Sequence, residues 1–219
     1  MARRTIDLSL YLVTDDALAR GRSLERIVGD ALAGGVTAVQ LREKATPTRE
    51  LIARGERIRE ITAAAGVTLI VNDRVDVALA IDADGAHVGQ DDLPAERARA
   101  LLGAERVLGV TVGDDRQAAG ALDAGADYVG STAVFVTSTK PDAGKPIGLA
   151  ALAELVRASR LPVVAIGGID ASNAHAVLAT GVAGIAVVSA ILSADDPRAA
   201  AGRLRDIVRG ARRTVRSHA

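Results

Sequence analysis

Short apolar runs rich in β-branched residues alternate along the chain with longer segments that have the periodicity of amphipathic helices. The runs are apolar at nearly every position, which is typical of parallel strands that are buried on both faces. The predicted strands cover residues 10–14, 38–42, 68–71, 86–88, 107–110, 128–130, 163–166 and 184–188. The predicted helices cover residues 23–34, 48–65, 75–81, 94–103, 116–124, 149–159, 173–180 and 197–213.

This alternation of strand and helix predicts the fold class. Repeated strand–helix units indicate an α/β protein with a parallel sheet, and eight such units favour a (β/α)8 TIM barrel. Because no linker or low-complexity segment interrupts the units, we expect a single domain over residues 1–219, with an ordered core over about 8–213. A doubly wound open sheet is the alternative.

Composition excludes several function classes. The aromatic residues are Tyr11, Tyr128 and Phe135 alone, which disfavours nucleic-acid binding by base stacking. The 27 basic and 27 acidic residues balance, so no net field attracts nucleic acid or an anionic membrane. There is no cysteine and no apolar segment long enough to span a membrane. We therefore expect a cytoplasmic protein that binds small molecules; the sequence leaves the oligomeric state open, a homo-oligomer included.

Polar residues gather where the predicted strands end. In barrels of this kind the active site lies at the carboxyl ends of the strands. Gln40, Arg42 and Lys44 alternate along the second strand, so their side chains are predicted to point to the barrel mouth together. One guanidinium, one ammonium and one amide suit a diphosphate. A surface charge cluster, or an arginine paired with a buried carboxylate, is the alternative.

Two carboxylates follow neighbouring strands. Asp73 ends the third strand and Asp92 follows the fourth, where the two could share a cation. Mg²⁺ prefers one or two carboxylates together with water and phosphate oxygens. Both residues also precede predicted helices, so helix N-capping is the alternative. Asp91 is the weaker ligand candidate, because neighbouring side chains point to opposite sides.

A second anion site is predicted at the ends of the last two strands. Gly167 and Gly168 follow the seventh strand, and Val188 and Ser189 end the eighth. Backbone N–H groups at these two loops form the phosphate site that recurs in such barrels. His87 lies within the fourth strand and is interpreted as a packed polar group rather than a base.

Five segments together resemble thiamine-phosphate synthases. They occur in the order of that family and extend over most of the barrel, which makes the resemblance specific. The segments are Val39–Lys44, Val71–Arg74, Gly85–Asp92, Thr137–Lys140 and Ala165–Ile169.

The resemblance implies a condensation between two small molecules. A pyrimidine methyl diphosphate loses pyrophosphate, and the ring nitrogen of a thiazole phosphate takes up the methylene carbon. By this resemblance the pyrimidine diphosphate would be held by Gln40, Arg42, Lys44, Asn72, Thr111 and Lys140, of which Arg42, Lys44, Thr111 and Lys140 would be catalytic. Mg²⁺ would be bound by Asp73 and Asp92, and the thiazole phosphate by Thr137, Ser138, Thr139, Gly168, Val188 and Ser189.

The implied chemistry agrees with the residue types. Loss of a diphosphate needs cations to stabilise the leaving group rather than a strong nucleophile. Two details depart from the family. Residues 130–136 lack the Gly-Pro pair that often precedes the loop after strand six, and Thr111 replaces a common serine. A thiazole tautomerase, an aldolase-like barrel and a non-catalytic phosphometabolite-binding barrel are the alternative functions.

Overall fold

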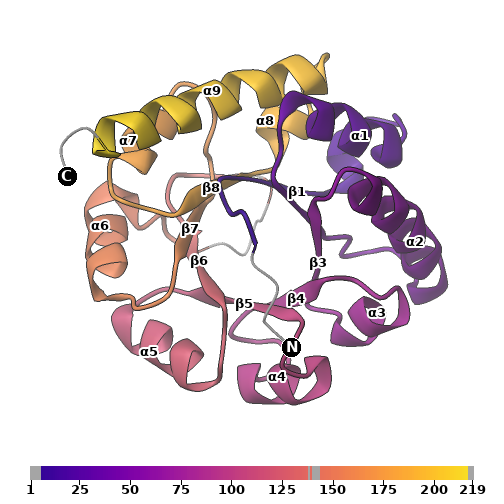
Figure 1. Cartoon of the computed structure of the whole chain (residues 1–219), viewed down its shortest axis with the longest axis horizontal. Helices are drawn as coiled ribbons and strands as arrows, with labels where there is room; N and C mark the ends of the chain where they lie inside the picture. Colours follow the sequence, from indigo (N-terminus) through magenta and orange to yellow (C-terminus); the bar gives the residue numbers. More distant parts are fainter. Residues whose placement is uncertain (1–5, 138, 140–143, 217–219) are drawn as a thin grey trace.

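The computed structural model describes residues 6–137, 139 and 144–216, with the backbone alone for residues 214–216. Eight parallel strands form a closed barrel in sequence order, and the helices surround it (Figure 1). The strands are β1 (Leu10–Val13), β2 (Ala38–Leu41), β3 (Thr68–Asn72), β4 (Gly85–Val88), β5 (Val107–Val112), β6 (Tyr128–Ala133), β7 (Val163–Ile166) and β8 (Gly184–Val187). The helices are η1 (Asp16–Ala19), α1 (Leu24–Gly34), α2 (Thr48–Ala64), α3 (Val75–Ala80), α4 (Ala95–Leu102), α5 (Asp115–Asp123), α6 (Gly148–Ala158), α7 (Ala174–Leu178), α8 (Ser189–Leu192) and α9 (Pro197–Arg216).

The barrel prediction is confirmed, and the open sheet is excluded because β1 pairs with β8. The pattern missed two short helices, η1 and α8, because four residues are too few to show a helical period. Ser189 therefore begins a helix instead of ending a strand. The last helix also continues to Arg216, past the predicted end.

Strand β6 is longer than predicted. Its last residues include Ser131 and Thr132, whose polarity ended the predicted run, yet their backbone continues the strand. The pairing of β6 with β7 shifts register between Gly130 and Ala133. Such irregularities bend a strand and often lie beside active sites, because they redirect side chains.

Apolar side chains form two separate layers. The larger cluster lies between the strands and the helices, and the smaller one fills the barrel interior. The interior cluster contains both tyrosines, Tyr11 and Tyr128, which are essentially inaccessible to solvent. Among the described residues, no helix is both long and apolar enough to span a membrane.

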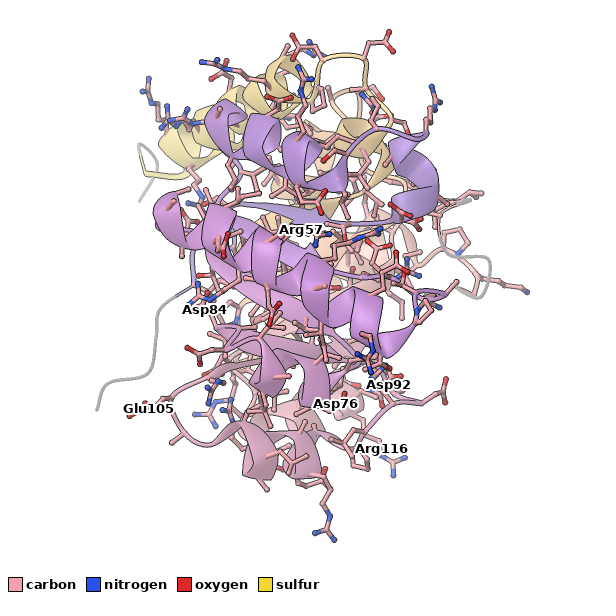
Figure 2. The ribbon with its side chains drawn as sticks, turned by 90° about the vertical axis from the view of Figure 1, so that its right-hand side faces the viewer. Arg57, Asp76, Asp84, Asp92, Glu105 and Arg116 are labelled. Carbon is pink, nitrogen blue, oxygen red and sulfur yellow. The ribbon has the colours of Figure 1, made fainter. Side chains whose placement is uncertain are left out.

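The amino-terminal face of the barrel uses aspartates structurally. Asp84 precedes β4 and accepts a hydrogen bond from the Leu69 N–H at 2.9 Å. Asp127 precedes β6 and accepts from the Leu108 N–H at 2.8 Å. Asp84 and Asp92, before and after β4, lie on opposite sides of the molecule (Figure 2). The fold thus employs acidic residues at one face for strand pairing and leaves others to line the mouth.

Candidate active site

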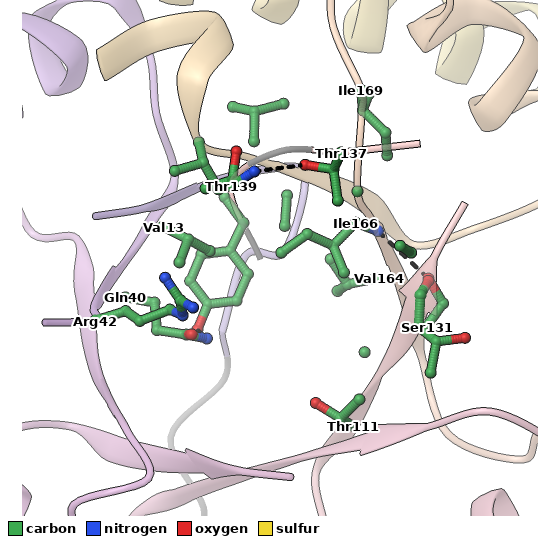
Figure 3. Close-up of a pocket in the computed structure, with 18 of the residues that line it drawn as sticks. Val13, Gln40, Arg42, Thr111, Ser131, Thr137, Thr139, Val164, Ile166 and Ile169 are labelled. Atoms are coloured by element: carbon green, nitrogen blue, oxygen red, sulfur yellow. Dashed lines mark hydrogen bonds between the residues drawn. The ribbon is translucent and has the colours of Figure 1, made fainter. Parts of the chain in front are cut away.

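A pocket opens at the carboxyl ends of the strands and extends into the barrel interior. Polar side chains from β2 and β5 reach it from different sides, and Thr137 and Thr139 lie across it from Thr111 (Figure 3). Apolar side chains such as Val164 and Ile166 form part of its wall. The predicted site residues that line it are Gln40, Arg42, Asn72, Thr111, Thr137, Thr139, Gly168, Val188 and Ser189.

The three residues predicted to act together on β2 occupy different depths. Gln40 is buried inside the barrel, where its Nε2 donates to the Tyr11 hydroxyl at 3.1 Å. Arg42 lies nearer the mouth and also lines the pocket. Lys44 is exposed and is not among the lining residues, because β2 ends at Leu41 and alternation does not extend that far. Arg42, the first residue after β2, is therefore the cation of these three that reaches the pocket itself.

Arg42 is held by contacts on both its backbone and its side chain. Its N–H donates to Thr14 Oγ1 at 2.9 Å, and Thr14 in turn donates to Glu43 at 2.9 Å. Its guanidinium lies 3.3 Å from the Asp15 carboxylate. This ion pair agrees in part with the alternative to diphosphate binding given above, in which the arginine pairs with a carboxylate. Burial raises the pKa of Glu43. These contacts orient the guanidinium before any ligand is bound.

Asp73 and Asp92 lie together, as predicted. The pKa of Asp73 is raised to about 6, first by burial and then by the adjacent Asp92 carboxylate, while Lys44 and Arg42 oppose the rise. Asp73 adopts a left-handed backbone conformation with φ 59, which aspartate tolerates better than most residues. Asp92 accepts a hydrogen bond from the Gly89 N–H at 2.8 Å. The two carboxylates repel each other, and a cation between them would relieve that repulsion.

Helix capping does not account for these two carboxylates. The residue that precedes α3 is Arg74 and the residue that precedes α4 is Pro94, and neither position has a side-chain cap. Among residues 6–137, 139 and 144–216, no three acidic, histidine or cysteine side chains converge on a metal position. A site with two carboxylates fits Mg²⁺, which completes its octahedron with water and phosphate oxygens.

The aspartate pair leads to a prediction about stability. In metal-free protein at pH 7, Asp73→Asn is expected to raise the free energy of unfolding by about 1 kcal/mol, after allowance for solvent screening. Aspartate in an unfolded chain has a pKa of about 4, whereas the pKa of Asp73 in the folded protein is about 6. The parent protein therefore loses stability as pH rises through this window, and the variant does not. Urea unfolding at pH 4 and pH 7 measures the difference.

Two controls accompany this measurement. Asp91→Asn removes a neighbouring exposed carboxylate and should leave stability nearly unchanged at both pH values. Added Mg²⁺ should stabilise the parent protein more than Asp73→Asn, because ligand binding to the folded state alone raises stability. A gain of equal size at both pH values would show that repulsion within the pair is not the cause.

The opposite side of the pocket is formed by two glycines and by backbone N–H groups. Gly167 and Gly168 follow β7 with φ of 100 and 64, a region that favours glycine. A Cβ atom on Gly168 would lie 2.6 Å from the Val136 carbonyl oxygen, so the chain passes closely over this turn. Ser189 begins α8, where the first N–H groups have no partner within the helix. This arrangement suits the second predicted anion site.

The interior of the barrel carries polar groups that the sequence patterns did not assign to the site. Tyr11, Tyr128 and His87 all line the pocket. Burial raises the pKa of both tyrosine hydroxyls, which therefore remain protonated at neutral pH. His87 is 8% exposed, in keeping with a packed polar group. Its two ring nitrogens form hydrogen bonds with the hydroxyl groups of Tyr128 and Thr111. In the sequence the two tyrosines appeared only among the few aromatic residues, and no motif assigned them to the site.

Two predicted site residues, Ser138 and Lys140, lie outside the described residues. The segments on either side of them are anchored to the barrel. The Phe135 N–H donates to the Gly167 carbonyl at 3.1 Å, and the Ile147 N–H donates to the Ala133 carbonyl at 3.0 Å. Gly167 and Ala133, whose carbonyl groups accept these hydrogen bonds, both line the pocket.

Comparisons with known proteins agree on one family. The family model described as thiamine monophosphate synthase matches residues 10–191. A thiamine-phosphate synthase of Roseiflexus sp. (strain RS-1) is 52% identical over 92% of this chain and 86% of its own length. Another, from Moorella thermoacetica, is 52% identical over 93% of this chain and 97% of its own length.

A solved structure extends the agreement to three dimensions. The thiamine phosphate pyrophosphorylase from Pyrococcus furiosus superposes with a TM-score of 0.86 at 42% identity, covering 94% of this chain and 97% of that one. A 3-hexulose-6-phosphate synthase, at 19% identity and a TM-score of 0.67, shares the fold alone. With the family model over most of the barrel and relatives at half identity, this chain belongs to the thiamine-phosphate synthase family.

Proposed function

We propose that this protein condenses 4-amino-2-methyl-5-hydroxymethylpyrimidine diphosphate with a hydroxyethylthiazole phosphate. The bond between the pyrimidine methylene carbon and the diphosphate oxygen breaks, and its electron pair leaves with pyrophosphate. The thiazole nitrogen then donates its lone pair to the methylene carbon, which gives thiamine phosphate. The observation that carries this proposal is one pocket lined by Arg42 on one side and by Gly167, Gly168 and Ser189 on the other, since a condensation of two phosphorylated substrates needs two anion-binding regions.

The pyrimidine diphosphate is assigned to the region on β2 to β5. Arg42 supplies a fixed guanidinium, which can bind the diphosphate through two N–H groups. Charge builds on the leaving diphosphate as the bond breaks, so donors that are already oriented lower the barrier. The residues assigned here are Gln40, Arg42, Lys44, Asn72, Thr111 and Lys140, with Arg42, Lys44, Thr111 and Lys140 acting on the leaving group.

Mg²⁺ is assigned to Asp73 and Asp92. Their adjacent carboxylates and the raised pKa of Asp73 support a cation there. When bound, Mg²⁺ would neutralise charge on the diphosphate and make it a better leaving group. Lys44 lowers the pKa of Asp73, which places its positive charge close to the same position. The cluster thus combines two anionic ligands for the metal with cations for the diphosphate.

The thiazole phosphate is assigned to the glycine-rich side of the pocket. Backbone N–H groups after β7 and at the start of α8 suit a phosphate monoester, and apolar side chains beside them suit the ring. Thr137 and Thr139 line the same pocket and add hydroxyl groups. The residues assigned here are Thr137, Ser138, Thr139, Gly168, Val188 and Ser189.

A thiazole tautomerase is the second candidate. Such an enzyme acts on the thiazole phosphate alone and has no need of a diphosphate and metal region. Arg42 with its supporting contacts, and the Asp73–Asp92 pair, favour the condensation. The test mixes both substrates with Mg²⁺ and measures pyrophosphate and thiamine phosphate. We expect equal amounts of the two products; absence of pyrophosphate, or change of the thiazole phosphate alone, would refute the proposal.

A further inference from the structure

Five side chains form a continuous hydrogen-bonded chain across the barrel interior. It joins β2 to β5 along the pocket wall, and every contact is within 3.1 Å. Its order is Gln40 Nε2 to Tyr11 Oη at 3.1 Å, Tyr11 Oη to Tyr128 Oη at 2.9 Å, Tyr128 Oη to His87 Nδ1 at 3.0 Å, and His87 Nε2 to Thr111 Oγ1 at 2.8 Å. Both end residues, Gln40 and Thr111, line the pocket.

The chain has a definite direction. An amide nitrogen can only donate, so the Tyr11 hydroxyl accepts from Gln40. Among the described residues, Tyr128 is the remaining partner of the Tyr11 hydroxyl, so Tyr11 donates its proton there. By the same reasoning, the Tyr128 hydroxyl accepts from Tyr11 and has His87 Nδ1 as the remaining acceptor for its own proton, so it donates there. In the reverse direction the proton of Tyr11 would be buried without an acceptor, which is costly.

This direction determines the tautomer of His87 and the role of Thr111. A neutral imidazole that accepts at Nδ1 carries its proton on Nε2. His87 Nε2–H then donates to Thr111 Oγ1. Because its oxygen already accepts this bond, Thr111 directs its own proton elsewhere, and it lines the pocket. In the other tautomer Thr111 would donate to His87 and offer only lone pairs to a ligand.

We propose that Tyr128 is a positioning residue that holds His87 in the Nε2–H tautomer, so that Thr111 faces the leaving diphosphate as a hydrogen-bond donor. This inference rests on the proposed function for the identity of the ligand at Thr111. A hydroxyl that is already oriented as a donor stabilises the growing charge of the leaving group without reorganisation. Tyr128 itself bonds within the interior chain and acts through its neighbours.

Two glycines make room for this arrangement. Gly109 pairs in register with His87 on one side and with Tyr128 on the other. A Cβ atom at Gly109 would overlap both the Tyr128 hydroxyl and His87 Nδ1, the two atoms of the central hydrogen bond. A Cβ atom on Gly130 would lie 3.2 Å from His87 Cε1. Glycine weakens a strand interior, so its presence here indicates that close approach is required.

The tautomer can be measured directly. Nitrogen-15 NMR of the full chain with labelled histidine distinguishes Nε2–H from Nδ1–H, and His175→Gln and His218→Gln identify the His87 signals by subtraction. We expect the Nε2–H form in the parent protein and a mixture of forms in Tyr128→Phe. Tyr11→Phe is the matched control: it removes a hydroxyl from the same chain but leaves Tyr128 to donate to His87, so the tautomer should be retained.

Kinetics separate positioning from a loss of packing. Tyr128→Phe should lower kcat for pyrophosphate release about tenfold, the order expected when one transition-state hydrogen bond is weakened. The KM for thiazole phosphate should stay the same. In a Thr111→Val background, where no hydroxyl remains to be oriented, Tyr128→Phe should cause no further loss.

Several results would overturn the inference. They are an Nδ1–H tautomer in the parent protein, an equal tautomer change in Tyr11→Phe, or a full effect of Tyr128→Phe in the Thr111→Val background. The tautomer of the parent protein needs no substrate and no variant. Failure of the proposed condensation would therefore leave the NMR result intact, and the two failures can be told apart.

Discussion

Arg42→Ala is expected to lower kcat/KM for pyrophosphate release by about a thousandfold, the order found when a preorganised transition-state contact is removed. Arg42 directly follows β2 and lines the pocket, and its orientation is maintained by Thr14 and Asp15. Its loss would leave the departing charge with fewer donors and would leave Asp15 without its partner. Steady-state release of pyrophosphate with both substrates and Mg²⁺ measures this effect.

The two-region pocket makes this prediction selective. The dissociation constant of thiazole phosphate from Arg42→Ala, measured by calorimetry, should remain within about twofold of that of the parent protein. The reason is that well-separated sites act independently. Arg49→Ala, on the exposed surface of α2, is the matched control and should keep full activity. An equal loss of both ligands in Arg42→Ala would contradict the division of the pocket into two regions.

Gly168→Ala should have the opposite selectivity to Arg42→Ala, with its larger effect on thiazole phosphate. The added methyl group would be strained at φ 64 and would lie 2.6 Å from the Val136 carbonyl oxygen and 2.9 Å from Phe135 Cβ. Strain of this kind costs roughly 1–3 kcal/mol, so we expect the KM for thiazole phosphate to rise about thirtyfold. The turn after β7 and the segment leading to Thr137 would both be displaced. Kinetics with varied thiazole phosphate at saturating pyrimidine diphosphate measure this change.

Two comparisons make the glycine result interpretable. The KM for the pyrimidine diphosphate should change by less than about twofold, since the described residues assigned to it lie on or after β2, β3 and β5, at least two strands from β7 in the barrel order. Gly120→Ala on α5 is the matched control, because nothing lies within 4 Å of its added Cβ and alanine favours a helix. If Gly168→Ala weakened both substrates equally, general unfolding of the mouth would be the better explanation.

Much of the architecture follows from local pattern. Apolar runs and helical periods each reflect burial that a residue and its near neighbours determine, so the eight strands and their helices could be located from sequence. The helices η1 and α8 were missed because they are single turns. The end of β6 was missed because the polar Ser131 is buried within the strand rather than in a loop.

How deep each site residue lies in the barrel could not be predicted from the sequence in the same way. Gln40 and Arg42 were expected to act at one position, yet Gln40 belongs to the interior chain and Arg42 to the mouth. His87 was interpreted as packing alone, and only its contacts with Tyr128 and Thr111 connect it to the pocket. Such differences depend on barrel closure, which brings residues from distant strands into one layer.

By itself, the sequence determined the barrel, the face that carries the site, the family and the residue types at each strand end. Those properties depend on short-range order and on motifs, which a linear pattern contains. Only the tertiary structure decided that Asp73 and Asp92 adjoin without capping helices, and that Gln40 is joined to Thr111 through two tyrosines and a histidine. Proximity across a closed sheet and the direction of a hydrogen bond are three-dimensional properties, because they depend on which strands the closed barrel brings together.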